Sequence, residues 1–564
     1  MPTLHWIGKE KVINHHMDVP YKVLDHSYGF KDGNQSTEET KSENKIIHGD
    51  NLDALKALLP EYEGRIKCIY IDPPYNTGNE NWVYNDSVND PKIKKWLGKV
   101  VGKEAEDLTR HDKWLCMMYP RLKLLHKLLA NDGVIFISID ENEISNLRIL
   151  MNEIFGAENF IEQLVWNKRI PKNDKFIGNI HEYVLLFVKQ KSYGHSFKQK
   201  KEGLPEINEL LVALKRKNIS IPNAEIEIKN LYKKNNYDRG ITLYNSLDQD
   251  YKLWGKINVS WPNGQTLGPR YDVLHPKTGK PCKVPERGWR WTRDTFDSFL
   301  DYNNTEELHD GSFKCGKIWF AKDENTQPSS IKYLEDVSDF LLRSIISTKS
   351  EGSISLKNLT DERFDYPKPV ELIEILISSF DINEGIILDS FAGSGTTAHS
   401  VLNLNKEDGG NRKFILVEME DYAETITSER VKRVIKGYSD IEGTGGSFDF
   451  YELGPSLFLE DGMLNEEVGI DKMRQYIFYT ETTKPLGEVT LIDNESFLGK
   501  YNDTSYYFYY NQEAITTLDH TFLSSMRTRA EQYIIYADNC LLTKSFMTKH
   551  HIIFKKIPRD ITRF

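Results

Sequence analysis

The amino-acid sequence predicts an α/β protein built on a doubly wound, mostly parallel sheet with helices on both sides. From about Lys45 to Gln190, short apolar segments alternate with helical patterns, as expected for a parallel sheet. Two apolar runs, 68–71 and 386–388, each end at an aspartate and lead into a turn rich in proline or glycine. At 564 residues the chain is too long for one core, so we expect roughly three or four structural units.

The first part of the chain divides into an extension and one segment of the α/β domain. Residues 1–44 are predicted to be an N-terminal extension without a core, with a mobile polar tract at 32–36. Residues 45–190 are predicted to supply the first strands and helices of the sheet domain. A helix is predicted before a strand at Val134, because apolar residues recur there at spacings of three and four: Leu115, Met118, Leu122, Leu125 and Leu129.

The rest of the chain is predicted to contain an insert, a second segment of the same domain and a separate C-terminal unit. The insert, 191–348, carries lysine and arginine clusters, and an insert of this size inside an α/β domain is more often functional than filler. Residues 349–445 supply the remaining strands and the glycine-rich turn. Residues 446–564 form an α/β unit, in which the aromatic run 506–510 and the apolar run 552–554 are predicted strands.

The tetrapeptide Asp72-Pro73-Pro74-Tyr75 is the first candidate for chemistry. Its prolines fix φ and remove two donors, which makes the segment rigid and leaves a carbonyl free to accept a hydrogen bond. Asp72 and the Pro73 carbonyl are suited to draw hydrogens from an exocyclic amine, whose lone pair is otherwise delocalised into its ring. Tyr75 offers a face for an extruded base, worth roughly 1 to 3 kcal/mol. An ordinary Pro-Pro turn with a surface tyrosine is the alternative.

The second candidate is the glycine turn from Asp389 to Thr397. A strand, a Gly-x-Gly turn and a helix can bind NAD, FAD, ATP or S-adenosylmethionine. Ala398 stands at the third glycine position of the dinucleotide fingerprint, and no Gly-Lys-Ser/Thr follows, which disfavours a phosphate-binding loop. About twenty residues on, a predicted strand ends at Glu418, where an acid can accept hydrogen bonds from ribose hydroxyls. A solvated loop carboxylate is the alternative for Glu418.

Taken in this order, the two motifs resemble the β-group amino methyltransferases of DNA, and in particular the modification subunit of type III restriction-modification systems. The resemblance covers most of the chain. The segments that carry it are 4–10, 49–52, 72–78, 134–140, 367–369, 389–397 and 554–560. It implies a Rossmann-like, S-adenosylmethionine-dependent methyltransferase domain, an inserted target-recognition domain at 191–348 and a C-terminal assembly domain at 446–564.

The resemblance also implies a role for each site residue. Asp72, Pro73, Pro74 and Tyr75 become the catalytic tetrapeptide that holds a flipped base, and the leading aspartate favours adenine N6 over cytosine N4. The implied S-adenosylmethionine site comprises Asp50, Lys368, Asp389, Ser390, Phe391, Ala392, Gly393, Ser394, Gly395, Thr396 and Glu418. Asp50 and Glu418 are expected at the adenosine half of the cofactor and Lys368 near its carboxylate. Ser390 departs from the proline that many of these enzymes carry.

The partners implied by the resemblance are double-stranded DNA, a second copy of the chain and a restriction (helicase-nuclease) subunit. The alternatives are a stand-alone adenine or cytosine-N4 DNA methyltransferase, an RNA methyltransferase and a catalytically silent DNA-recognition scaffold. A nicotinamide-dependent oxidoreductase is a further alternative; it would explain the glycine turn but would leave the tetrapeptide without a function.

Composition is compatible with this interpretation. A net charge of −11 excludes DNA binding by bulk electrostatics but allows a local basic groove. We find no bilayer-spanning run and no signal-peptide pattern, so we expect a cytoplasmic protein without a membrane partner. The five cysteines lack close pairs, and we expect reduced thiols and no metal site. A site formed by His275, Cys282 and Cys315 is the disfavoured alternative.

Overall fold

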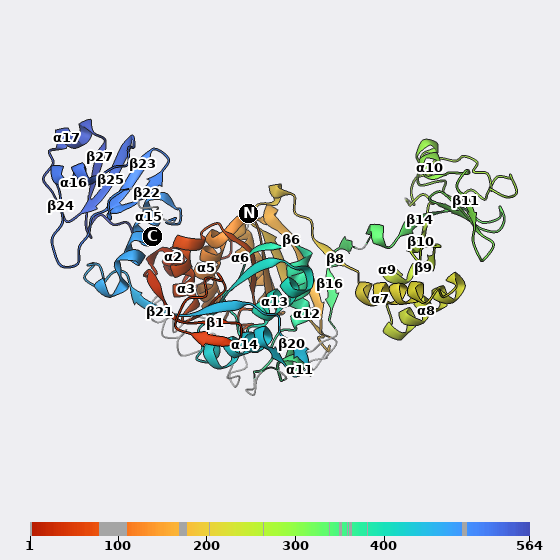
Figure 1. The fold of residues 1–564 in the computed structure, drawn as a ribbon, viewed down its shortest axis with the longest axis horizontal. Helices are drawn as coiled ribbons and strands as arrows, with labels where there is room; N and C mark the ends of the chain where they lie inside the picture. The colour runs from red at the N-terminus through yellow and green to blue at the C-terminus, as the bar shows by residue number, and fades with distance from the viewer. Residues whose placement is uncertain are drawn as a thin grey trace. The chain divides into compact units, whose positions relative to one another are not determined.

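The computed structural model divides the chain into two compact units (Figure 1). The main unit contains Met1–Phe197 and Arg343–Phe564, and the inserted unit is Lys198–Leu342. The inserted unit lies within the range 191–348 that the sequence assigns to a separate domain. The structure describes residues 3–77, 110–168, 177–201, 203–237, 239–262, 264–337, 339–348, 352–357, 359, 364–380, 382–487 and 493–563.

The main unit is built around a large twisted sheet. Its eleven strands within the described residues, in spatial order, are β16 (Ile345–Ser347), β6 (Phe160–Asn167), β7 (His181–Val188), β5 (Leu129–Ile139), β4 (Ile66–Ile71), β17 (Glu384–Asp389), β18 (Asn411–Glu418), β3 (Lys45–His48), β21 (Ser447–Ser456), β1 (Lys22–Lys31) and β2 (Asn34–Ser36).

The centre of this sheet is parallel, as predicted. β5, β4, β17, β18, β3 and β21 run in the same direction, whereas β7 is antiparallel to both β5 and β6. The neighbouring strands β4, β17 and β18 come from two distant parts of the sequence, and their carboxyl ends meet at one edge. Ligands of open α/β sheets bind at this edge, where helices leave for opposite faces.

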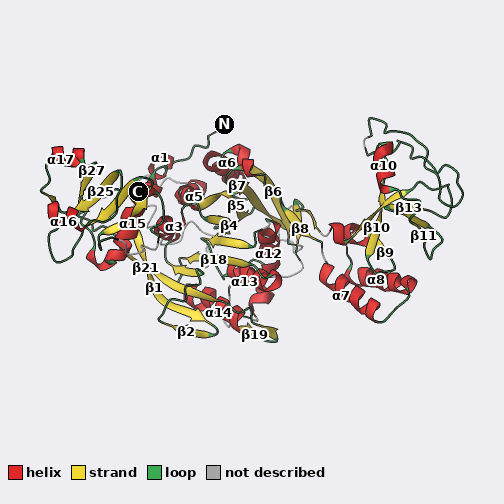
Figure 2. Ribbon diagram, turned by 45° about the horizontal axis from the view of Figure 1, so that its top comes forward, coloured by secondary structure: helices red, strands yellow, loops and turns green. Residues whose placement is uncertain are grey.

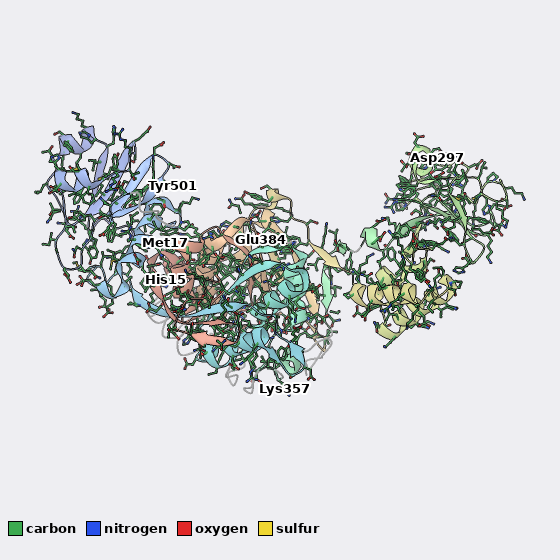
Figure 3. All side chains as sticks on the ribbon, viewed as in Figure 1. His15, Met17, Asp297, Lys357, Glu384 and Tyr501 are labelled. Atoms are coloured by element: carbon green, nitrogen blue, oxygen red, sulfur yellow. The ribbon has the colours of Figure 1, made fainter. Side chains whose placement is uncertain are left out.

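Helices cover both faces of the sheet (Figure 2). One layer consists of α3 (Asn51–Tyr62), α5 (Arg110–Leu128) and α6 (Ile144–Phe155), and the other of α12 (Val370–Ser379), α13 (Thr396–Asp408) and α14 (Glu429–Lys436). Buried apolar side chains of α3, α5 and α6 form one core with those of the sheet; Figure 3 draws the side chains on the ribbon. The helix predicted before Val134 is α5, which buries Leu115, Met118, Leu122 and Leu125 as expected, whereas Leu129 begins β5. The α/β prediction is therefore confirmed.

The expectation that residues 1–44 lack a core is wrong. They form α1 (Lys9–Val12), α2 (His15–Asp18) and β1, which pairs with β21 in the main sheet. The tract at 32–36 makes the turn into β2, which pairs with β1. The sequence hides this arrangement because the partner strand lies more than 400 residues away. The same long-range pairing places β21 in the main sheet, so the predicted boundary at 446, which assigns β21 to the C-terminal unit, lies too early in the sequence.

The inserted unit contains a sheet and a group of helices. Its antiparallel strands are β11 (Thr305–Glu307), β12 (Phe313–Cys315), β13 (Ile318–Phe320), β14 (Ser329–Tyr333), β10 (Leu253–Asn258) and β9 (Tyr244–Leu247). Its helices among the described residues are α7 (Leu204–Arg216), α8 (Ile221–Asn235), α9 (Arg239–Thr242) and α10 (Arg293–Phe299). Trp289 is fully buried beside Cys282 and Cys315. His275 Nε2 lies 3.0 Å from the Ala321 carbonyl.

The C-terminal part of the main unit has its own small sheet. Its strands are β22 (Phe497–Tyr501), β23 (Thr504–Phe508), β25 (Gln532–Ala537) and β27 (Ile552–Lys556), and they pack on α15 (Ile470–Thr482). β23 contains the first three residues of the strand predicted at 506–510 and ends at Phe508, and β27 confirms the strand predicted at 552–554. The Tyr479 hydroxyl of α15 donates a hydrogen bond to Glu63 beside α3. No helix among the described residues is long and apolar enough to cross a bilayer.

Candidate active site

The tetrapeptide follows β4 directly and lies at the carboxyl edge of the sheet. Pro73, Pro74 and Tyr75 are buried, and the side chain of Asp72 is partly buried. Trp114 Nε1 of α5 donates to the Pro74 carbonyl at 2.7 Å. This buried hydrogen bond fixes the rigid segment to the helix layer.

Asp72 belongs to a chain of alternating charges. Lys368 Nζ lies 2.7 Å from Asp72 Oδ2 and 3.6 Å from Glu182 Oε2 of β7. Glu182 Oε1 also accepts from Lys168 at 2.6 Å, and its Oε2 accepts from the Tyr75 hydroxyl at 3.0 Å. The Lys368 ammonium lies over the Tyr75 ring, 4.7 Å from the centroid. The negative charges of two carboxylates are thus balanced by the positive charges of two lysines around the tetrapeptide.

One oxygen of Asp72 has an unfilled hydrogen-bonding capacity. Oδ1 is buried and has no hydrogen-bond partner among the residues that the structure describes. Burial raises the pKa of Asp72 above its ordinary value, and Lys368 offsets part of that rise. Burial also acts to raise the pKa of Glu182, but Lys368 and Lys168 outweigh it and hold the pKa below its ordinary value. A buried acceptor without a donor is costly, so Oδ1 is suited to receive a ligand's N–H.

The glycine turn joins β17 to α13. Asp389 Oδ1 accepts from the Phe391 amide at 3.0 Å, and its Oδ2 accepts from the Thr397 hydroxyl at 2.5 Å. Gly395 has φ +79°, and a Cβ there would lie 3.1 Å from the Thr427 carbonyl. A side chain at this position would therefore meet both backbone strain and a tight contact.

The remaining residues of the turn form hydrogen bonds with β18 and with Arg430 of α14. The Ala392 amide donates to the Val417 carbonyl at 3.1 Å. Arg430 Nη1 donates to the hydroxyls of Ser394 and Thr396, both at 2.8 Å. The Thr396 hydroxyl also donates to the backbone carbonyl of Lys368 at 3.3 Å. The turn is thus tied to the segment that delivers Lys368 to the tetrapeptide.

Glu418 ends β18 and faces the turn. Its Oε2 accepts from the Gly393 amide at 2.7 Å, and its Oε1 accepts from the Glu420 amide at 3.1 Å. Burial raises the pKa of Glu418 to about 7, against these hydrogen bonds, and burial likewise raises the pKa of Asp389 to about 7. An ionised carboxylate can accept about four hydrogen bonds, so Glu418 retains acceptor capacity for a ligand.

Asp50 caps the N-terminus of α3. Its carboxylate accepts from the Leu52 amide at 2.8 Å and lies 3.6 Å from the Arg121 guanidinium. Arg121 Nε donates to the side-chain oxygen of Asn51, and Asn51 Nδ2 donates to the Ser390 carbonyl at 3.2 Å. A buried network therefore connects the cap to the glycine turn.

A pocket opens between the two motifs. Its lining comprises Asn51, Pro74, Met117, Arg121, Ser390, Phe391, Val417, Glu418 and Met419. In this lining, Pro74 belongs to the tetrapeptide, Ser390 and Phe391 belong to the glycine turn, and Glu418 belongs to the neighbouring strand β18. The hydroxyl oxygen of Ser390 is buried without a hydrogen-bond partner among the described residues. The pocket thus brings together segments that are more than 300 residues apart.

The structure places the predicted residues in three groups. The tetrapeptide and Lys368 form one cluster, the turn from Asp389 to Thr396 forms a second with Glu418, and Asp50 stands beside them at α3. The second half of the motif at 72–78 includes Gly78, which lies outside the described residues. Residues that the sequence did not single out for the site are Asn51, Trp114, Arg121, Lys168 and Glu182. Asn51 could have been found from its place in the segment 49–52 that carries the resemblance, whereas no sequence pattern singled out Lys168.

Comparisons with known proteins point in one direction. The model of a DNA methylase family, N6_N4_Mtase, matches residues 66–429. The Mod subunit of the type III restriction-modification enzyme EcoP15I from Escherichia coli is 34% identical, over 78% of this chain and 67% of its own length. The StyLTI Mod subunit of Salmonella typhimurium is 28% identical, over 82% of this chain and 64% of its own length.

Two further similarities extend the comparison. The type II methyltransferase M.KpnI of Klebsiella pneumoniae is 30% identical, over 70% of this chain and 85% of its own length. A solved structure of a DNA modification methylase from Thermus thermophilus, complexed with S-adenosyl-L-methionine, has 12% identity and a TM-score of 0.30, over 72% of this chain and 99% of that one. The chain spans about two thirds of the length of the type III relatives.

Proposed function

This chain belongs to the DNA methylase family, and from that premise we propose that it transfers a methyl group from S-adenosylmethionine to adenine N6 in a short DNA sequence. It acts as the modification and recognition subunit of a restriction-modification system. The observation that carries the proposal is the pocket between Pro74 and Glu418, together with Asp72 Oδ1 in the same tetrapeptide, which is buried without a hydrogen-bond partner among the described residues. The proposed acceptor for the amine, Asp72, therefore lies in the same tetrapeptide as Pro74, which lines the proposed site of the adenosyl ligand.

The residues present fit the cofactor. The Glu418 carboxylate and the capping carboxylate of Asp50 suit ribose and adenine donors, and the turn around Phe391 and Gly393 suits the methionine side. Lys368 is the candidate for the cofactor's carboxylate, although in the structure its ammonium lies on Asp72. When bound, S-adenosylmethionine supplies an electrophilic methyl group on a sulfonium.

The chain's own residues then activate and orient the base. Asp72 and the Pro73 carbonyl accept the two amine hydrogens of adenine, which directs the nitrogen lone pair out of the ring plane. Tyr75 stacks on the flipped base and offsets part of the cost of extruding it. Cys68 of β4 is fully buried and its pKa is raised to about 12, so it stays a thiol. Transfer is direct, without a covalent enzyme intermediate, and positioning supplies most of the acceleration.

The inserted unit is the proposed reader of the DNA sequence. Arg287 and Arg290 are exposed on either side of the buried Trp289. Their backbones are fixed, because the Gly268 amide donates to the Arg287 carbonyl at 2.8 Å and the Arg290 amide donates to the Val259 carbonyl at 2.7 Å. Two arginines on a fixed loop are suited to contact phosphates or guanine edges. A second copy of the chain and a restriction subunit complete the proposed assembly.

Single-molecule sequencing of DNA from cells that express the full chain tests this function. We expect N6-methyladenine at one short, asymmetric sequence and on one strand. N4-methylcytosine at the site would favour the cytosine-specific alternative. A DNA without modified bases, combined with binding of S-adenosylmethionine, would favour an RNA substrate or a missing partner. Absence of both would favour the silent scaffold.

The affinity for the cofactor is expected to rise with pH. The pKa of Glu418 is about 7 without a ligand, and donation from ribose hydroxyls favours the ionised form, so binding releases a proton below pH 7. We expect the Kd for S-adenosylmethionine to fall about tenfold between pH 6 and pH 8, as one proton is released. Calorimetry in buffers of different ionisation enthalpy measures this release. Glu418→Gln is the matched control and should bind more weakly with little pH dependence; an equally steep profile would contradict the assignment.

A further inference from the structure

The Lys368 ammonium lies where the proposed mechanism needs the target amine. It donates to Asp72 Oδ2 at 2.7 Å and lies 4.7 Å from the centroid of the Tyr75 ring. Adenine N6 has to make the same two contacts, one with the carboxylate and one with the ring. Asp72 Oδ1 can accept from the amine, but the ammonium on Oδ2 covers the face of Tyr75 on which the base would stack, so Lys368 has to move aside when a base enters.

Glu182 is the acceptor beside this position. Its Oε2 lies 3.6 Å from Lys368 Nζ, so a shift of about one ångström would turn this contact into a direct charge-assisted hydrogen bond. Glu182 itself is held in place, because Lys168 donates to its Oε1 and the Tyr75 hydroxyl donates to its Oε2. Its side chain is only 6% exposed, so water cannot readily replace it as the partner of a displaced ammonium.

We infer that Glu182 is a positioning residue for methyl transfer, which receives the Lys368 ammonium and so clears the Tyr75 ring and Asp72 for the base. The inference rests on the proposed function, since it needs a base to enter at Asp72. Without a carboxylate at 182, Lys368 stays on Asp72, because moving a buried ammonium away from its counter-ion is strongly unfavourable. Asp72 would then be a poorer acceptor for the amine. Glu182 would also keep the Tyr75 ring in place through its hydroxyl.

Glu182→Gln in the full-length protein tests the inference. Glutamine keeps the size and an oxygen for the Tyr75 hydroxyl but removes the charge. At saturating DNA and S-adenosylmethionine, we expect kcat to fall about tenfold or more. A kcat equal to that of the wild type would overturn the inference.

The chain offers a matched control at Glu481 in its C-terminal part. The Glu481 side chain is 8% exposed and accepts from the Tyr536 hydroxyl and from Lys555, which is the same kind of triad. Glu481→Gln should lower the melting temperature to a similar degree but leave kcat unchanged. A similar loss of kcat in this control would mean that Glu182→Gln acts through stability, which overturns the inference.

The double variant Glu182→Gln with Lys368→Gln separates release of Asp72 from a purely structural role. Removing the ammonium frees Asp72 again, so at saturating cofactor the double variant should have a higher kcat than Glu182→Gln alone. A kcat equal to or below that of the single variant overturns the inference while leaving the proposed function intact. A wild-type protein that methylates no DNA would overturn both.

Discussion

Asp72→Ala is expected to lower kcat for DNA methylation by about three orders of magnitude, with DNA and cofactor binding retained. Asp72 Oδ1 is buried without a hydrogen-bond partner among the residues that the structure describes, and in the proposed mechanism Asp72 is the acceptor that activates the amine. It makes no contact with the glycine turn in the structure as described, so the cofactor site should persist. Steady-state kinetics with a methyl-labelled cofactor measure kcat, and calorimetry measures the two affinities.

A matched control comes from the same sheet. Asp132 also pairs with a lysine, Lys67, but its side chain is 42% exposed and it lies at the amino end of the β5 core. Asp132→Ala should keep normal kcat, since an exposed ion pair contributes little. Asp72→Asn is informative as well, because asparagine keeps an acceptor oxygen and should retain more activity than alanine. Normal turnover of Asp72→Ala would refute the proposed mechanism.

Much of this site could be predicted from local sequence, because the carboxyl ends of parallel strands meet at one edge. The tetrapeptide follows β4, Asp389 ends β17 and Glu418 ends β18, and these three strands are neighbours. Each strand was visible as an apolar run, and the turn after each was visible as proline, glycine or an acid. The roles assigned to these residues remain predictions.

Glu182 and Lys168 could not be found in the same way. Glu182 lies on β7, which runs antiparallel to both of its neighbours, β5 and β6, and Lys168 directly follows β6. A glutamate at the start of an apolar strand looks like a solvated strand end, and only the pairing of β7 with β5 brings it to the tetrapeptide. β1 was missed for a related reason: it precedes the first catalytic segment in the sequence, whereas its partner strand β21 follows the second. Long-range strand pairing leaves little trace in a local pattern.

Lys368 connects the two sequence segments of the catalytic domain through its side chain and its backbone. Its side chain reaches Asp72 of the first segment, while its backbone carbonyl accepts from Thr396 in the glycine turn of the second. A change in the turn can therefore alter the charge balance at the tetrapeptide. Cofactor binding and base entry are expected to be coupled through this residue, because the cofactor's carboxylate attracts its ammonium and an entering base displaces it.

Tyr75→Ala is expected to lower kcat/KM for DNA by about 5- to 150-fold, whereas Tyr75→Phe should lose much less. Alanine removes the stacking surface, worth roughly 1 to 3 kcal/mol per base, and also the ring that lies beneath Lys368. Phenylalanine keeps the ring and loses only the hydroxyl that donates to Glu182. Fluorescence of 2-aminopurine at the target position reports base extrusion for each variant.

The contrast between the two Tyr75 variants distinguishes stacking from hydrogen bonding. Tyr75 is only 9% exposed and the Lys368 ammonium lies over its ring, so the ring opens to a base only when Lys368 moves aside. If stacking dominates, Tyr75→Phe extrudes the base almost as well as the wild type and Tyr75→Ala does not. Equal losses in both variants would assign the main role to the hydroxyl and its bond to Glu182. Equal activity in all three proteins would refute any role of Tyr75 in holding the base.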